Sequence, residues 1–201
     1  MKRPHGVVVA SKNRDKIAEV EAVLAALDPP IVVLPGHEWA DIDETEDSLA
    51  GNALLKARAV CAATGHAAVA DDTGLEVDAL DGGPGVHTAR YAGDAASYDD
   101  NIDKLLEAMD GASERGARFR SVIALVTPSS AEVVVEGVLE GFITKGRRGE
   151  RGFGYDAVFE VAGVGDSAQF KGRTLAEIGA DDKNRISHRA VALRILADHL
   201  S

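Results

Sequence analysis

The chain has 201 residues, of which 45% are hydrophobic, and it carries a formal net charge of −11. This length and composition suffice for one good-sized domain with a core of its own. The negative charge argues against nucleic acid as a partner, because a nucleic-acid-binding surface needs a basic face. An anionic ligand would have to be held by local Lys or Arg side chains or by a metal, against the general field of the protein.

Cysteine content and hydropathy indicate the compartment. The single cysteine, Cys61, excludes an internal disulfide and fits a reducing cytosol. No apolar run reaches membrane-spanning length, and Met1–His5 have no long apolar segment behind them. We therefore expect a cytoplasmic protein with no membrane partner.

The first element is a β-branched run, Val7–Ala10, which predicts a buried strand. A polar turn follows, and then Ile17, Val20, Val23 and Leu24 recur at helical spacing. The turn supplies six candidate ligands: Ser11, Lys12, Asn13, Arg14, Asp15 and Lys16. Two interpretations remain open, an anion site at the helix N-terminus or a capped surface helix. A glycine-rich phosphate loop is absent.

A second strand is predicted over Ile31–Leu34, before an acidic loop, Asp41–Asp47. Acidic runs are usually solvated, and the alternative is that one or two of these acids face a metal shared with Asp72. Ser48 is a good N-cap for the next helix, which carries Lys56 and ends near Gly65.

Ala67–Ala70 reads as a short buried strand that ends on Asp71, Asp72, Thr73 and Gly74. Successive strand side chains point to opposite faces, so the two carboxylates cannot both face one ligand unless the strand has already ended. One of them is expected to face a cleft and the other to brace the backbone. A carboxylate at a strand end holds a hard cation, accepts a proton from water, or caps the next turn.

The second half predicts a strand over Leu75–Leu80, a helix over Tyr98–Met109, and two long strands, Phe119–Val126 and Val133–Ile143, joined by a hairpin turn. This pair indicates a mixed sheet or a second lobe.

Phe153–Asp156 is read in two ways, as a strand start with core aromatics or as a stacking platform for a base with Asp156 as hydrogen-bond partner. Asp182–Arg189 is expected to open the terminal helix. There Lys183, His188 and Arg189 lie within two turns, and such donors suit phosphate or carbonyl oxygens.

Each signal is weak alone, but their order is specific. The sequence Asp-Asp-Thr-Gly-Leu from Asp71, then Phe-Gly-Tyr-Asp from Phe153, then Ser-His-Arg from Ser187, closely resembles the Ham1 (RdgB) family of inosine triphosphate pyrophosphatases. The resemblance runs from about Val7 to Leu200, and includes the Ser11–Lys16 turn and Asn52–Ala57.

The resemblance implies an α/β fold with a long mixed central sheet flanked by helices, and two lobes with an active-site cleft between them, all in one bilobal domain spanning residues 1–201. It implies Mg²⁺-dependent cleavage of non-standard purine nucleoside triphosphates (ITP, dITP, XTP) to the monophosphate and pyrophosphate, by a homodimer that cleanses the nucleotide pool.

It also assigns roles to residues. Ser11, Lys12, Asn13, Arg14, Asp15 and Lys16 would wrap the phosphates, and Lys56 would add a cation. Glu44 and Asp72 would bind magnesium. Asp72 would accept a proton from the attacking water, and Asp71 would orient Asp72. Lys16 would assist in catalysis, and Thr73 would contact the substrate.

For the base, Phe153 would stack, within the block that includes Gly154 and Tyr155, and Asp156 would accept from ring N–H groups. Lys183, His188 and Arg189 would donate to a 6-keto oxygen, so adenine would leave buried donors unpaired.

One departure concerns Gly51, where the family usually has an acid. Either Glu46 or Asp47 substitutes for it, or activity is reduced. The Ser11-Lys12-Asn13 sequence in place of Thr-Gly-Asn is milder. Two alternatives to the implied activity therefore remain, a pyrophosphatase of different base preference and a non-catalytic nucleotide-binding protein.

Overall fold

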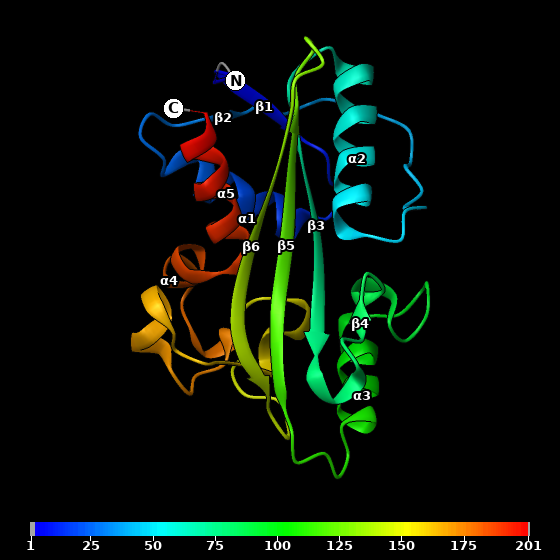
Figure 1. Cartoon of the computed structure of the whole chain (residues 1–201), viewed down its shortest axis with the longest axis vertical. Coiled ribbons are helices and arrows are strands. Elements are labelled where there is room, and N and C mark those ends of the chain that lie inside the picture. The colour runs from blue at the N-terminus through cyan, green and yellow to red at the C-terminus, as the bar shows by residue number, and fades with distance from the viewer. Residues whose placement is uncertain (1–2, 201) are drawn as a thin grey trace. The chain divides into compact units, whose positions relative to one another are not determined.

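The computed structural model describes residues 3–200. Its elements alternate between strands and helices in the first half of the chain, and the two longest strands are consecutive in the second half (Figure 1). Their bounds are β1 Gly6–Val9, α1 Arg14–Ala25, β2 Val32–Val33, α2 Leu49–Thr64, β3 Ala68–Val77, β4 Pro84–Gly85, α3 Tyr98–Ala108, β5 Gly116–Val126, β6 Glu132–Ile143, β7 Phe159–Val161, α4 Ala180–Ile186 and α5 His188–His199.

Within residues 3–200 the strands form a seven-stranded sheet in the order β2-β1-β3-β5-β6-β7, with β4 paired to β3. The strand β1 runs parallel to both β2 and β3, whereas β3–β4 and β6–β7 are antiparallel. The sheet is therefore mixed and flanked by helices, which confirms the predicted fold class. The predicted hairpin turn is confirmed as well, because the Thr127 N–H donates to the Ala131 carbonyl between β5 and β6.

The chain divides into two compact units. The first, called here the N-terminal unit, comprises the chain up to Asp72, Ser121–Gly137 and the chain from His188. The second, called the central unit, comprises Thr73–Arg120 and Val138–Ser187. Each unit has its own cluster of buried apolar side chains, so each has an apolar driving force for folding.

The core of the N-terminal unit lies between its strands and the helices α1 and α5, which lie side by side (Figure 1). Val20 and Leu24 of α1 and Leu193 of α5 are almost fully buried. Gly137 of β6 permits close packing of α5, because a Cβ atom there would overlap the backbone of His188 and Ala192. Glycine is therefore required where this strand meets the helix.

The core of the central unit is built on α3, whose apolar stripe includes Ile102 and Leu105. Phe119 and Phe159 belong to the same core, with ring centroids 4.6 Å apart and planes tilted by 43°. Offset, tilted aromatic pairs of this kind add to the burial of apolar area.

The strand that begins at Ala68 does not end at the carboxylates. It continues through Asp71–Gly74 to Val77, so the predicted strand end and turn at this point are wrong. The turn propensity of these residues is overridden here, because cationic side chains stabilise both carboxylates within the sheet. The predicted strand over Leu75–Leu80 is correspondingly shorter, since residues 78–80 form a short 3-10 turn.

Two further predictions of local structure are corrected. Residues 154–157 form a 3-10 turn, so Phe153–Asp156 is not the start of a strand. The single terminal helix is wrong too, because Ser187 is extended (φ −61°, ψ 153°) and separates α4 from α5. No helix within residues 3–200 combines the length and apolarity that a membrane span requires.

Candidate active site

The strand β3 places Asp71 and Asp72 next to each other with their side chains on opposite faces of the sheet. Both are buried, at 3% and 6% exposure. Asp71 faces α1 and α5, where Lys16 and Arg189 contact it, and Asp72 faces α2, where Lys56 contacts it. The continuous strand thus gives the two adjacent carboxylates separate environments.

Asp71 lies in a closed network of charges. Its Oδ2 is 2.9 Å from Lys16 Nζ and 3.0 Å from Arg189 Nη2, and its Oδ1 accepts a hydrogen bond from the Ser121 hydroxyl. Arg189 also pairs with Glu19 of α1. Burial disfavours ionisation of Asp71, but Arg189, Lys16 and Ser121 outweigh it and hold the pKa of the carboxyl well below its usual range. Asp71 is therefore an anion that positions cations, and a poor proton acceptor.

Asp72 has the opposite character. Its Oδ1 accepts from Lys56 Nζ at 2.9 Å, and the same ammonium group donates to Glu44 Oε1 at 2.7 Å and to the Asp71 carbonyl at 2.9 Å. Burial raises the pKa of Asp72, Lys56 and Lys16 oppose that effect, and Glu44 adds to it. A carboxyl group with a raised pKa is a better base when ionised.

Near Lys56, the buried atoms Asp72 Oδ2 and Asn52 Nδ2 have no hydrogen-bond partner among the described residues. Asn52 is 1% exposed on the same face of α2 as Lys56, and its Oδ1 accepts from the Glu46 backbone N–H at 3.0 Å. Buried polar groups normally find partners, so an oxygen and an amide without one indicate a place for a polar ligand.

The donor set fits magnesium. Asp72 and Glu44 offer hard oxygen atoms that meet at one ammonium group, and Mg²⁺ in proteins takes one or two carboxylates together with water and phosphate oxygens. Within residues 3–200 no group of three or more His, Cys, Asp or Glu side chains is gathered in a way that could hold a metal. A metal here would therefore take its remaining ligands from the substrate or from water.

The turn before α1 serves the helix itself. Asn13 is the N-cap, and its Oδ1 accepts from the backbone N–H groups of Asp15 at 2.9 Å and Lys16 at 3.3 Å. The Ser11 hydroxyl accepts from the Asn13 N–H at 3.2 Å. The capped-helix interpretation is thus confirmed, and it holds Lys16 in the first turn, near Asp71.

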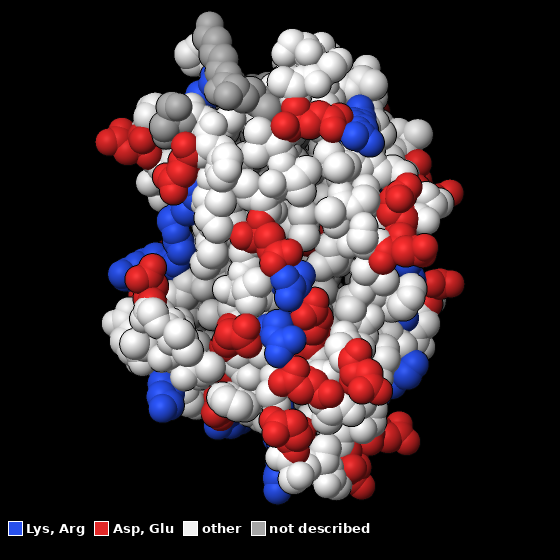
Figure 2. Space-filling view, in the orientation of Figure 1, with Lys and Arg blue, Asp and Glu red and all other residues white. Residues whose placement is uncertain are grey.

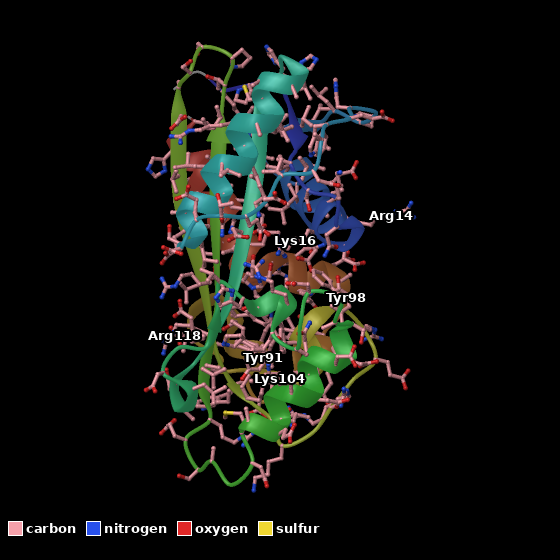
Figure 3. The ribbon with its side chains drawn as sticks, turned by 90° about the vertical axis from the view of Figure 1, so that its right-hand side faces the viewer. Arg14, Lys16, Tyr91, Tyr98, Lys104 and Arg118 are labelled. Atoms are coloured by element: carbon pink, nitrogen blue, oxygen red, sulfur yellow. The ribbon has the colours of Figure 1, made fainter. Side chains whose placement is uncertain are left out.

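The other side chains of this turn lie elsewhere. Lys12 pairs with Asp41 of the acidic loop, and Arg14 is exposed and points outward (Figure 3). Ser11, Lys12 and Arg14 line a cavity of about 600 Å³ together with His37 and Trp39, whereas Lys16 does not line it. Within the N-terminal unit the six predicted phosphate ligands therefore divide between two places.

Glu46 packs directly on Gly51. A Cβ atom at Gly51 would lie 2.7 Å from Glu46 Cβ and 3.1 Å from Glu46 Oε2. The first of these distances is shorter than real Cβ contacts allow, so any side chain at position 51 would have to displace Glu46. Of the two acids considered as substitutes, Glu46 is the one that fills this space.

The central unit holds Phe153, Asp156 and Lys183 together. Asp156 Oδ2 accepts from the Phe153 backbone N–H at 2.9 Å and pairs with Lys183, and both charged side chains are buried. The Lys183 ammonium group lies 4.6 Å from the centroid of the Phe153 ring. Gly152 has φ +75°, and a Cβ atom there would overlap the Asp156 carboxylate, so only glycine lets the chain pass this group.

A pocket of about 440 Å³ opens beside this cluster and is lined by Tyr98, Phe153, Gly154 and Asp156, among others. Tyr155 does not line it. It is buried in the core of the central unit, where its hydroxyl donates to the Thr88 carbonyl at 2.9 Å and burial raises its pKa. The block therefore supplies a core aromatic, Tyr155, although it does not start a strand, and it turns Phe153 and Asp156 toward a pocket, where binding of a base stays a prediction.

The three predicted base donors do not form one cluster on a single helix. Lys183 belongs to α4 in the central unit, whereas His188 and Arg189 begin α5 in the N-terminal unit. His188 is 4% exposed, and Arg189 is 2% exposed with its guanidinium bound to Asp71 and Glu19. Thr73 lies half-buried on β3, in the central unit.

Four residues with a clear place in these sites were not predicted from sequence. Their identities are Glu19, Asn52, Ser121 and Tyr98. Tyr98 had a signal, since aromatic residues make up only 4% of the chain and this one starts a helix. Glu19 and Ser121 are ordinary polar residues whose partners, Arg189 and Asp71, come from distant parts of the sequence, and Asn52 stands out only by its burial.

Over the middle of the sheet in Figure 2, basic side chains alternate with acidic ones. In the central unit, Arg118 pairs with Glu76 and Asp78, and Arg120 pairs with Glu76. Half-exposed ion pairs of this kind contribute little to stability.

Comparison with known proteins gives consistent relatives. The Ham1 family model matches residues 7–199. A dITP/XTP pyrophosphatase of Methylococcus capsulatus is 47% identical over 198 residues, covering 96% of this chain and 95% of the relative, and one of Elusimicrobium minutum is 45% identical, covering 92% and 94%. The structure of a HAM1 protein from Coxiella burnetii superposes with a TM-score of 0.80 at 39% identity, covering 97% of this chain and 98% of that one.

Proposed function

Because the chain belongs to the Ham1 family, we propose that it hydrolyses non-standard purine nucleoside triphosphates (ITP, dITP and XTP) to the nucleoside monophosphate and pyrophosphate. The observation that carries the proposal is the buried Asp72, which has a raised pKa and one oxygen without a partner among the described residues, beside Lys56 and Glu44. Such a group has the chemistry of a proton acceptor for an attacking water.

The cations of the N-terminal unit suit the phosphates. Lys16 and Lys56 are both held at buried carboxylates, so they are ordered before substrate arrives. Ordered cations lose little entropy on binding a polyphosphate, and they offset the overall negative charge of the protein locally. Asp71, kept ionised by Arg189, Lys16 and Ser121, holds Lys16 close enough to Asp72 for its charge to oppose the rise in the pKa of Asp72.

Magnesium would be held by Asp72 and Glu44, and when bound it would acidify water and neutralise phosphate charge. Asp72 then takes the proton of the water that attacks the α-phosphorus, and pyrophosphate leaves. Lys56, which contacts both carboxylates, keeps their oxygens oriented and stays protonated, because Asp72 and Glu44 raise its pKa against the effect of burial.

In the central unit, Phe153 would stack on the base, Asp156 would accept from a ring N–H, and Lys183 would donate to the 6-keto oxygen. Adenine has an amino group at this position, so the buried ammonium group would meet a donor where the 6-keto purines offer an acceptor. Sites built on hydrogen bonds reject such mismatches by orders of magnitude.

Further features are proposed on the resemblance alone: residues 1–201 act as one bilobal domain, and the protein works as a cytoplasmic homodimer. Light scattering coupled to size exclusion tests the dimer, with one peak at twice the chain mass of 21.0 kDa expected.

A substrate panel tests the activity. Purified protein with Mg²⁺ is given ITP, dITP, XTP, ATP and GTP, and released pyrophosphate and monophosphate are measured. We expect turnover of the first three, with equal amounts of monophosphate and pyrophosphate, and none without the metal. Release of inorganic phosphate and a diphosphate would contradict attack at the α-phosphorus.

A non-catalytic nucleotide-binding protein is the second candidate, and Gly51 favours it, because the family usually has an acid there. It predicts tight binding of ITP with no pyrophosphate. The same panel, combined with calorimetric titration of ITP without metal, separates binding from turnover, and a shifted ranking of substrates would instead indicate a different base preference.

A further inference from the structure

We propose that Tyr98 is a second aromatic wall of the pocket beside Phe153 and contributes stacking affinity for the base. The inference deepens the proposed function and rests on it. Tyr98 and Phe153 both line the 440 Å³ pocket, their ring centroids are 5.9 Å apart, and their planes are tilted by 40°. All these contacts lie within the central unit.

The Phe153 ring already has one face in use. The Lys183 ammonium group lies over it, 4.6 Å from the centroid, and Lys183 is in turn held by Asp156. A base can then stack only on what remains of the Phe153 surface. A second ring set at an angle to Phe153 enlarges that surface and contacts the base from another side.

Tyr98 is well placed to be rigid. It is the first residue of α3 (Figure 3), directly after the N-cap Ser97. Ser97 and Asp100 form a reciprocal capping box, with distances of 2.8 and 3.1 Å. Capping fixes the start of the helix and so the direction of the first side chain. A preorganised ring loses little entropy when a ligand binds.

Tyr98 is also unusually exposed for its size, at 43%. The other aromatic residue with comparable exposure among residues 3–200 is Phe142, at 45%, and Phe142 lines a different pocket of the same unit, with Arg115 and Arg147. An exposed aromatic at the mouth of an aromatic pocket can exchange water for a base, and Phe142 provides a matched control for an exposed ring without that setting.

The role is one of affinity and not of chemistry. Stacking is tolerant of base identity, because every base has a π-face. We therefore expect Tyr98 to lower KM for ITP, dITP and XTP by similar factors while kcat is unaffected. Ligands without a base should be indifferent to it.

The test compares Tyr98→Ala, Tyr98→Leu, Tyr98→Phe and the control Phe142→Ala. For each, kcat and KM are measured with dITP, and calorimetry gives Kd for dIMP and for inorganic pyrophosphate. We expect Tyr98→Ala to raise KM and the Kd of dIMP about 5- to 20-fold, with kcat and pyrophosphate affinity unchanged. Tyr98→Leu should be intermediate, and Tyr98→Phe and Phe142→Ala should match the wild type.

The proposal is overturned if Tyr98→Ala or Tyr98→Leu binds dIMP as tightly as the wild type, or if pyrophosphate binding weakens by the same factor as dIMP binding. Thermal denaturation shows whether each variant folds. If Tyr98→Ala does not fold, the Kd of dIMP for Tyr98→Leu tests the proposal. The binding arm does not depend on turnover: a wild type that binds dIMP but releases no pyrophosphate refutes the proposed activity and leaves the role of Tyr98 measurable.

Discussion

The two units hold their polar side chains by different means. In the N-terminal unit, Asp71 and Asp72 are buried by pairing with cations from three helices, α1, α2 and α5. In the central unit one buried pair, Asp156–Lys183, is shaped by the backbone, since Gly152 makes room for the carboxylate and the Phe153 N–H donates to it. The first arrangement suits phosphates and a metal, and the second suits a flat, weakly charged base.

The two units are therefore expected to be sensitive to different kinds of substitution. A charge network is sensitive to the loss of any partner, because an uncompensated buried charge costs several kcal/mol. A pocket shaped by backbone and aromatic rings is sensitive to side-chain volume at a few positions. Substitutions chosen from each unit can therefore separate electrostatic from steric effects.

The largest effect is expected for Asp72→Asn. Asparagine cannot accept the proton of water or bind a cation strongly, so kcat should fall by about 10³-fold or more, with the fold intact. Pyrophosphate release from dITP measures it. The control is Asp41→Asn, which removes an exposed partner of a lysine in the same unit and should keep turnover within about twofold. Wild-type turnover in Asp72→Asn would remove this residue from the mechanism.

Arg189→Met should lower the free energy of unfolding by about 3–5 kcal/mol, because it leaves Asp71 and Glu19 without the guanidinium that pairs with both. Urea denaturation at pH 7 measures the change. Arg58→Met removes the exposed pair with Glu132 and should cost less than about 1 kcal/mol. If the two variants lost equal free energy of unfolding, the buried ion pairs around Asp71 would contribute no more to stability than an exposed pair, which would contradict the prediction.

The pH dependence of stability follows from Asp71. Its pKa is lower in the folded protein than in the unfolded chain, so its contribution is present above the ordinary range near 3.8 and is lost as the pH falls below it. Asp71→Asn should therefore be less stable than the wild type at pH 7, and the gap in unfolding free energy should narrow below about pH 4. Urea denaturation at pH 7, 5 and 3.5 measures this difference in unfolding free energy. A difference that stays constant with pH would contradict the lowered pKa of Asp71.

The smallest effect is expected from a pair of glycine substitutions in the central unit. Gly152→Ala and Gly154→Ala both place a side chain at positive φ, +75° and +59°, but only the first overlaps the Asp156 carboxylate. Both should lose about 1 kcal/mol of stability, and Gly152→Ala should in addition raise KM for dITP about tenfold. Identical KM values in the two variants would show that the position of the Asp156 carboxylate does not affect base binding, which would contradict the prediction.

The sequence by itself determined the fold class, the hairpin of β5 and β6, the Ser48 cap of α2 and the family. These depend on local patterns: apolar periodicity, caps and turns, and short motifs in a fixed order. The same patterns placed Phe153 with Asp156, since they are three residues apart and the turn between them brings one onto the other.

Tertiary structure decided the rest. The strand continues through Asp71–Asp72 only because Lys16, Arg189 and Lys56, from three helices, compensate the two charges, and no window around these residues contains that information. The same holds for Ser187, where the chain leaves one unit for the other. It holds as well for Arg189, to which the family resemblance assigns a role in base binding and which pairs with Asp71 and Glu19 in the fold. Long-range charge compensation is a property of the packed chain, so it cannot be predicted from local sequence.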